Sequence, residues 1–91
     1  MLVKRVMNMS NNIKFKYNHK DFDEDISEAI KRVEDAFFDY KNNPNIKMKY
    51  LDLKESIYDL CLVLKEKVIE GRISSVNAEK MKNYYWGLLL K

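Results

Sequence analysis

Glycine and proline are scarce in this sequence, which has two glycines and one proline in 91 residues. Strand-rich folds need many tight turns, and tight turns are built from those residues. Their scarcity therefore favours a few long helices. The composition, 46% hydrophobic and 34% charged, is typical of a globular domain, and the length is enough for one such domain.

Cysteine and histidine are equally scarce, with Cys61 and His19 as the only examples. A lone cysteine forms no intrachain disulfide and favours a reducing cytoplasm, and one Cys with one His gives no zinc spacing. We interpret Cys61 as a small buried thiol. The glycines are too far apart for a phosphate loop, and Asp21, Asp23 and Asp25 lack the glycine and glutamate of a calcium loop. We expect no cofactor, no small-molecule substrate and no enzymatic activity.

Long hydrophobic runs are missing too. None approaches the ~18–20 apolar residues of a membrane span, so no span is expected. Acidic residues are missing from positions 1–20, which carry a charge of +5 although the whole chain carries only +3. Positions 13–17 alternate apolar and basic residues as a strand does, but one strand forms no sheet alone. We therefore expect residues 1–20 to be a basic arm, extended or disordered, before a helical domain at residues 21–91.

The first helix is predicted from Asp21 to Asn42. Asp21 followed by Glu24 fits an N-cap with a capping box. Apolar residues then recur at helical spacing and predict one face turned to a core. These residues are Phe22, Ile26, Ala29, Ile30, Val33, Ala36, Phe37 and Tyr40.

The second helix is predicted from Pro44 to about Glu70, with Asn43 as its N-cap and Gly71 as its left-handed C-terminal cap. It carries two apolar rows about 140–180° apart. The main row is Ile46, Tyr50, Leu53, Ile57, Leu60, Leu64 and Val68, and the second is Leu51, Tyr58, Leu62 and Ile69. A surface helix needs only one apolar face. Two rows predict a helix held between its neighbours, or between its own domain and another molecule.

The third helix is predicted to begin after Ser74, its N-cap. Gly87 ends it or weakens it. Its inward residues are Ala78, Met81, Tyr84, Tyr85, Leu88 and Leu89. Trp86 and Leu90 point elsewhere.

The sequence thus predicts an all-α fold, an antiparallel three-helix bundle with a long central helix and an extended basic N-terminal arm. Several large apolar residues are left without an obvious core position, and aromatic residues anchor protein interfaces well. We therefore predict a non-enzymatic protein-binding module, acting by covering a partner protein as a homodimer or in a complex. The expected contact residues are Phe38, Leu51, Tyr58, Leu62, Trp86 and Leu90.

The layout resembles that of the small helical immunity proteins of bacteriocin-producing bacteria and of short accessory proteins of phages and plasmids. The similarity lies in size, long helices and the turn Gly71-Arg72-Ile73-Ser74 before an aromatic-rich last helix. The resemblance implies an inhibitor, immunity or adaptor type of protein. Immunity proteins usually have four helices where three are predicted here, and no motif transfers a functional residue.

Nucleic-acid binding is the alternative function. A basic arm with interleaved aromatic residues could follow phosphates and stack on bases. The candidate residues are Lys4, Arg5, Lys14, Phe15, Lys16, Tyr17 and Lys20. The predicted third helix carries few basic residues for reading a groove, and the body of the chain after the arm is slightly acidic.

Overall fold

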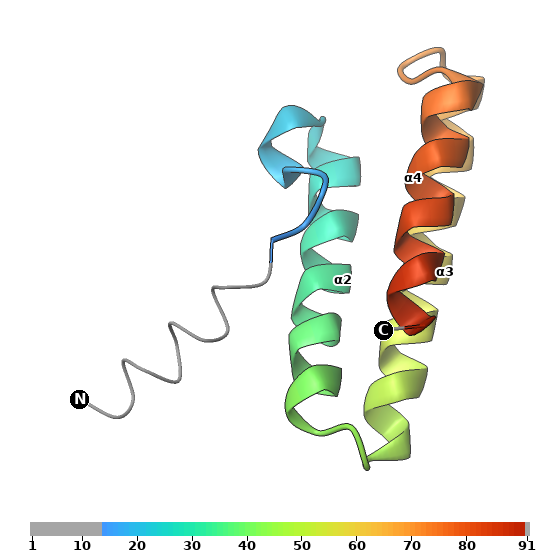
Figure 1. Ribbon diagram of the computed structural model, residues 1–91. Helices are drawn as coiled ribbons and strands as arrows, with labels where there is room; N and C mark the ends of the chain where they lie inside the picture. The colour runs from blue at the N-terminus through green and yellow to red at the C-terminus, as the bar shows by residue number, and fades with distance from the viewer. Residues whose placement is uncertain (1–13, 91) are drawn as a thin grey trace.

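The computed structural model describes residues 14–90. Within them the chain forms three α-helices, α2 (Glu24–Asn42), α3 (Lys47–Ile69) and α4 (Ser75–Gly87), each antiparallel to the one before it (Figure 1). A short 3-10 turn, η1 (His19–Asp21), precedes α2, and another, η2 (Leu88–Leu90), follows α4. The predicted all-α three-helix bundle with a long central helix is confirmed.

Helix α2 begins later than predicted. Its N-cap is Asp23, whose side chain accepts a hydrogen bond from the backbone N–H of Ile26. Asp21 was predicted to be the cap, but it belongs to η1, which Asn18 caps by accepting a hydrogen bond from the Lys20 N–H. The prediction was wrong because a 3-10 turn takes up the residues before Asp23.

Helix α3 also begins later than predicted. Asn43, expected to cap α3, ends α2 instead, since its backbone N–H and side-chain Nδ2 both donate to the carbonyl oxygen of Asp39. Pro44 and Asn45 form a turn closed by a hydrogen bond from the Ile46 N–H to the Asn43 carbonyl, and Ile46 is the N-cap residue. Because the preceding helix uses Asn43, α3 starts at Lys47.

The connection from α3 to α4 is the one predicted. Gly71 has a φ of +78°, the left-handed conformation that glycine adopts without strain. The N–H of Gly71 donates to the Val68 carbonyl and that of Arg72 to the Lys67 carbonyl, the hydrogen-bond pattern of a Schellman cap. Ser74 then caps α4 through the Asn77 N–H.

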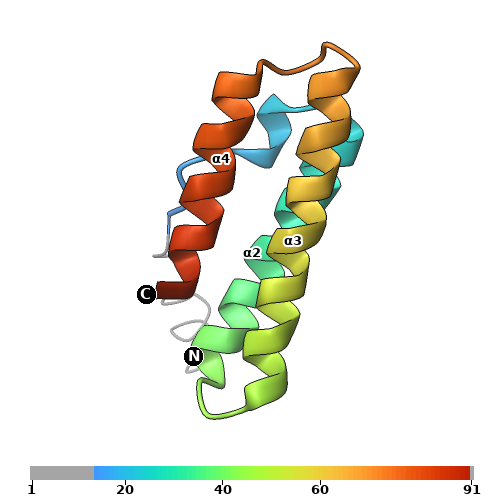
Figure 2. The same ribbon diagram turned by 90° about the vertical axis from the view of Figure 1, so that its right-hand side faces the viewer.

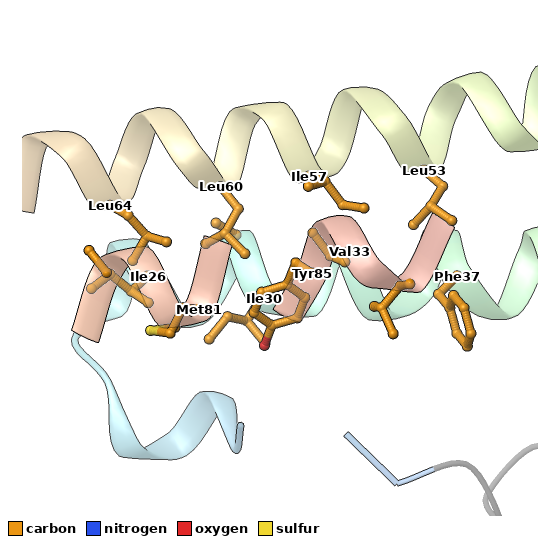
Figure 3. Packing of buried hydrophobic residues seen from close by; sticks show 13 residues of the cluster. Ile26, Ile30, Val33, Phe37, Leu53, Ile57, Leu60, Leu64, Met81 and Tyr85 are labelled. Carbon is orange, nitrogen blue, oxygen red and sulfur yellow. The ribbon is translucent and has the colours of Figure 1, made fainter. Parts of the chain in front are cut away.

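The core is built on one face of α3. Its four inner residues Leu53, Ile57, Leu60 and Leu64 are buried, and they point towards side chains of both α2 and α4 (Figure 3). In Figure 1 α2 lies beside α3 and α4 lies in front of it, and in Figure 2 α4 lies beside α3 and α2 behind it, so the two helices flank α3 from adjacent directions. The partners from α2 are Ile26, Ala29, Ile30, Val33 and Phe37, and those from α4 and η2 are Ala78, Met81, Tyr85 and Leu88. The core therefore uses only one of the two apolar rows of α3.

Tyr85 brings one unsatisfied polar atom into this core. Its side chain is completely buried, and within the described residues its hydroxyl oxygen has no hydrogen-bond partner. Burial, followed by the negative charge of Glu34, raises the pKa of Tyr85 above that of a free tyrosine. A buried hydroxyl without a partner costs free energy that a phenylalanine would not.

We expect Tyr85→Phe to raise the free energy of unfolding by about 1 kcal/mol, because the unpaired hydroxyl is removed. The advantage should grow above about pH 10, where an exposed tyrosine ionises. The folded state keeps the proton of Tyr85 longer than the unfolded state does, so the wild type loses stability as the pH rises. Urea unfolding followed by circular dichroism at neutral and alkaline pH measures both effects. A less stable Tyr85→Phe variant would show that the hydroxyl has a partner.

The two glycines form a matched pair for testing the cap. Gly71→Ala should cost about 1 kcal/mol of stability, because alanine is strained at positive φ, although no heavy atom lies within 4 Å of the added Cβ. Gly87 is the last residue of α4 and has equally open space. Gly87→Ala should therefore be neutral or stabilising by up to about 1 kcal/mol. Equal effects of the two substitutions in urea unfolding would contradict this account.

Candidate protein-binding face

The second apolar row of α3 is exposed. We call Leu51, Tyr58, Leu62 and Ile69 the outer row; their exposed fractions are 41%, 57%, 47% and 78%. Leu53, Ile57 and Leu60 on the inner face are at most 1% exposed. Both neighbouring helices pack on the inner face, so the described part of the chain leaves the outer row uncovered.

A groove runs beside the outer row, between α3 and α4. Its volume is about 450 Å³ and its apolar lining includes Tyr58, Leu62 and Ile69 of the outer row and Trp86 of α4. Charged residues also line it, and these are Lys65, Glu79 and Lys82. The groove therefore joins large apolar side chains with charges of both signs.

Cys61 lies in the same groove and is half-buried. Burial raises the pKa of its thiol, whereas the positive charge of Lys82 and a hydrogen bond with Trp86 lower it by less. A thiol with a raised pKa is protonated at neutral pH and is a poor nucleophile. The residue fits the predicted structural role better than a catalytic one.

The predicted contact residues do not all meet. Tyr58, Leu62 and Trp86 line one groove, and Leu51 continues the outer row beyond it. Leu90 is 90% exposed in η2 but does not line the groove. Phe38 is half-buried, with its ring 5.6 Å from that of Phe15 in an edge-to-face contact.

Two expectations about single residues need correction. Phe38 was expected to lack a neighbour inside the protein, but the segment before η1 covers it. Trp86 was expected to point away from the body, but it packs partly against the core while lining the groove. Cys61 and Val68 also line the groove although neither was predicted to. They are seven residues apart, one heptad, and so lie on the same side of α3 at the edge of the main row. This spacing is the signal that could have identified them.

The candidate nucleic-acid residues are divided between two environments. Lys14, Lys16 and Lys20 are exposed. Phe15 and Tyr17 are half-buried and pack against the core. The ring of Phe15 contacts those of Phe37 and Phe38. The ring of Tyr17 contacts those of Phe22, Tyr84 and Tyr85. The Lys16 N–H donates to the Tyr84 hydroxyl at 2.9 Å. Both aromatic rings are therefore already engaged, while Lys4 and Arg5 lie outside the described residues.

A cluster of ion pairs occupies the end of the bundle where α3 turns into α4. The side chain of Lys67 is buried, and its ammonium lies 2.9 Å from Asp25, 3.4 Å from Glu70 and 3.6 Å from Asp23. The hydrogen bond with Asp25 contributes most to raising the pKa of Lys67, although burial acts in the opposite direction and lowers that pKa. Arg72 pairs with Asp23 and Glu70 in turn. The cluster ties the start of α2 to the end of α3.

A second cleft, of about 600 Å³, lies next to this cluster and includes Asp21, Asp23 and Arg72 in its lining. Asp23 and Arg72 are already paired with each other and with their neighbours. Among residues 14–90, no cluster of three or more side chains is arranged to hold a metal ion. No helix in that range is long and apolar enough to span a membrane.

Comparisons of the chain with protein-family models, with curated proteins and with solved structures each found no match. The residues and their arrangement are therefore the basis for assigning a function.

The packing of Phe15 leads to a test of how residues 14–18, the segment before η1, are held. Phe15→Ala should lower the free energy of unfolding by about 1–2 kcal/mol, less than for a fully buried phenylalanine, because the ring is half-buried. Lys14→Ala, at the exposed neighbouring position, should change it by less than about 0.5 kcal/mol. Urea unfolding of both variants gives the comparison. An unchanged stability of Phe15→Ala would mean that the segment does not stay on the helices in solution.

Proposed function

We propose that this chain is a small helical protein-binding module that acts by covering the surface of a partner protein. The observation that carries the proposal is the exposed outer row on a helix whose other face already holds a complete core. Isolated exposed apolar residues are normal on soluble proteins, but four large ones along one side of a helix and beside an apolar groove are typical of an interaction site.

The chemistry of the face supports a protein as the ligand. Tyr58 and Trp86 are the residue types that anchor protein interfaces most strongly, and both line the groove. Lys65, Glu79 and Lys82 beside them supply a polar rim of mixed sign. A partner would place an apolar side chain between α3 and α4 and meet charged groups at the edge.

We propose binding as the activity, without catalysis. Burial raises the pKa of the Cys61 thiol, which lines the groove, and a protonated thiol is less reactive. The mode of action would be occupancy, as in an inhibitor, immunity or adaptor protein, including those of phages and other mobile elements. Nucleic-acid binding is the weaker candidate, because Phe15 and Tyr17 would have to leave the core to stack on bases.

The test compares proteins captured from the native host by the wild type and by face variants. Tyr58→Asp should lose them, because it puts a charge in the centre of the apolar face, while helix content by circular dichroism stays unchanged. Trp86→Ala should also weaken capture, but it will lower stability too, since Trp86 packs against the core.

Val76→Asp is the matched control. Val76 is a similarly exposed apolar residue of α4 that does not line the groove. This variant should capture the same proteins as the wild type. If Tyr58→Asp captures them as well, the proposed face is wrong. Loss of all capture in high salt, equally for every variant, would favour nucleic-acid binding instead.

A further inference from the structure

The outer row belongs to a longer set of exposed residues along α3, which we call the seam, and its two halves carry complementary residues. The seam consists of Leu51, Glu55, Tyr58, Leu62, Lys65 and Ile69, spaced alternately by four and three residues. This spacing keeps all six on one side of α3, and all six are exposed. Glu55 stands in one half and Lys65 in the other, each between two apolar residues.

We propose that this seam binds the same seam of a second copy of the chain, with the two α3 helices antiparallel. The inference rests on the proposed function and names a second copy as the occupant of the α3 part of the face. In a twofold-symmetric contact, every contact occurs in both directions: if residue i of one copy contacts residue j of the other, then residue j of the first copy contacts residue i of the second. Two antiparallel helices therefore pair residues placed symmetrically about a common midpoint.

With the midpoint at Leu60, every position of the seam receives a suitable partner. Leu51 meets Ile69 of the second copy, and Tyr58 meets its Leu62. Glu55 meets Lys65, so the two charged residues pair with opposite signs. Each contact occurs twice by symmetry, which gives four apolar contacts and two ion pairs along about 27 Å of helix.

The parallel alignment is less favourable. It would place Glu55 against Glu55 and Lys65 against Lys65 in the middle of the seam, where the second copy removes water. Like charges in a desolvated contact are costly. At the edge of the face, the parallel alignment would bring Lys54 near Asp59 of the second copy, and the antiparallel one brings the two copies of Asp59 near each other, but exposed charges contribute little. The charges within the seam therefore decide the direction.

The two charged positions provide the first test, the dimer dissociation constant from sedimentation over a wide range of protein concentration. Glu55→Lys alone and Lys65→Glu alone should each weaken dimerisation by about tenfold or more, since two contacts become repulsive. The double variant Glu55→Lys with Lys65→Glu should return to within about threefold of the wild type. Lys80→Glu, at an exposed position of α4 outside the seam, is the control and should dimerise normally.

Disulfide cross-linking provides the second test. Leu51→Cys and Ile69→Cys, each made in a Cys61→Ser background, should form a 51–69 disulfide when the two variants are mixed and oxidised. A prevalence of 51–51 and 69–69 disulfides would show a parallel pair and overturn the proposal. Single charge variants that dimerise as tightly as the wild type would overturn it as well.

A wild type that stays monomeric at all concentrations would also overturn this inference. It would leave the proposed function intact, provided that Tyr58→Asp still loses the captured host proteins. If Tyr58→Asp loses none of them, the proposed function itself fails. The two failures are therefore distinguishable.

Discussion

The structure depends on the packing of two helices against a single face of a third. Leu53, Ile57, Leu60 and Leu64 of α3 supply the buried surface for both α2 and α4. A helix of 23 residues is about 34 Å long, and α4 with its 13 residues is about 20 Å long. A single apolar row of α3 therefore serves both neighbours, and the opposite row is exposed. The exposed face follows from this arrangement.

The fold was largely predictable from the sequence, because helix existence depends on apolar periodicity that is strong here. The predicted inner residues of all three helices lie in or against the core, apart from Ile46 and Tyr50 at the start of α3. Gly71 and Ser74 were correctly predicted as caps because each has the residue type that its backbone position requires. The starts of α2 and α3 were wrong because Asp21 and Asp23, like Asn43 and Ile46, compete for the same role. The local hydrogen bonds that decide between them, from Ile26 to Asp23 and from Asn43 to Asp39, do not follow from residue type alone.

The site was only partly predictable. The outer row could be found from its angle to the main row, and its exposure agrees with that reasoning. The groove could not, because periodicity within one helix does not tell which neighbour lies beside it. The same holds for Phe38, which is covered by Phe15 from a segment without helical pattern. Contacts between a non-helical segment, such as residues 14–18, and a helix leave no periodic signal in the sequence.

Residues 14–18 and α4 are linked through Tyr84 and Tyr85, whose rings contact that of Tyr17. The Tyr84 hydroxyl also accepts a hydrogen bond from the Lys16 N–H. Release of either one removes contacts that hold the other. Opening of α4 should therefore also loosen Lys16 and Tyr17, while Phe15 of the same segment keeps its contacts with Phe37 and Phe38 of α2. The Lys16 amide, which donates to the Tyr84 hydroxyl, would then exchange its hydrogen at a rate similar to those of the α4 amides, far away in sequence.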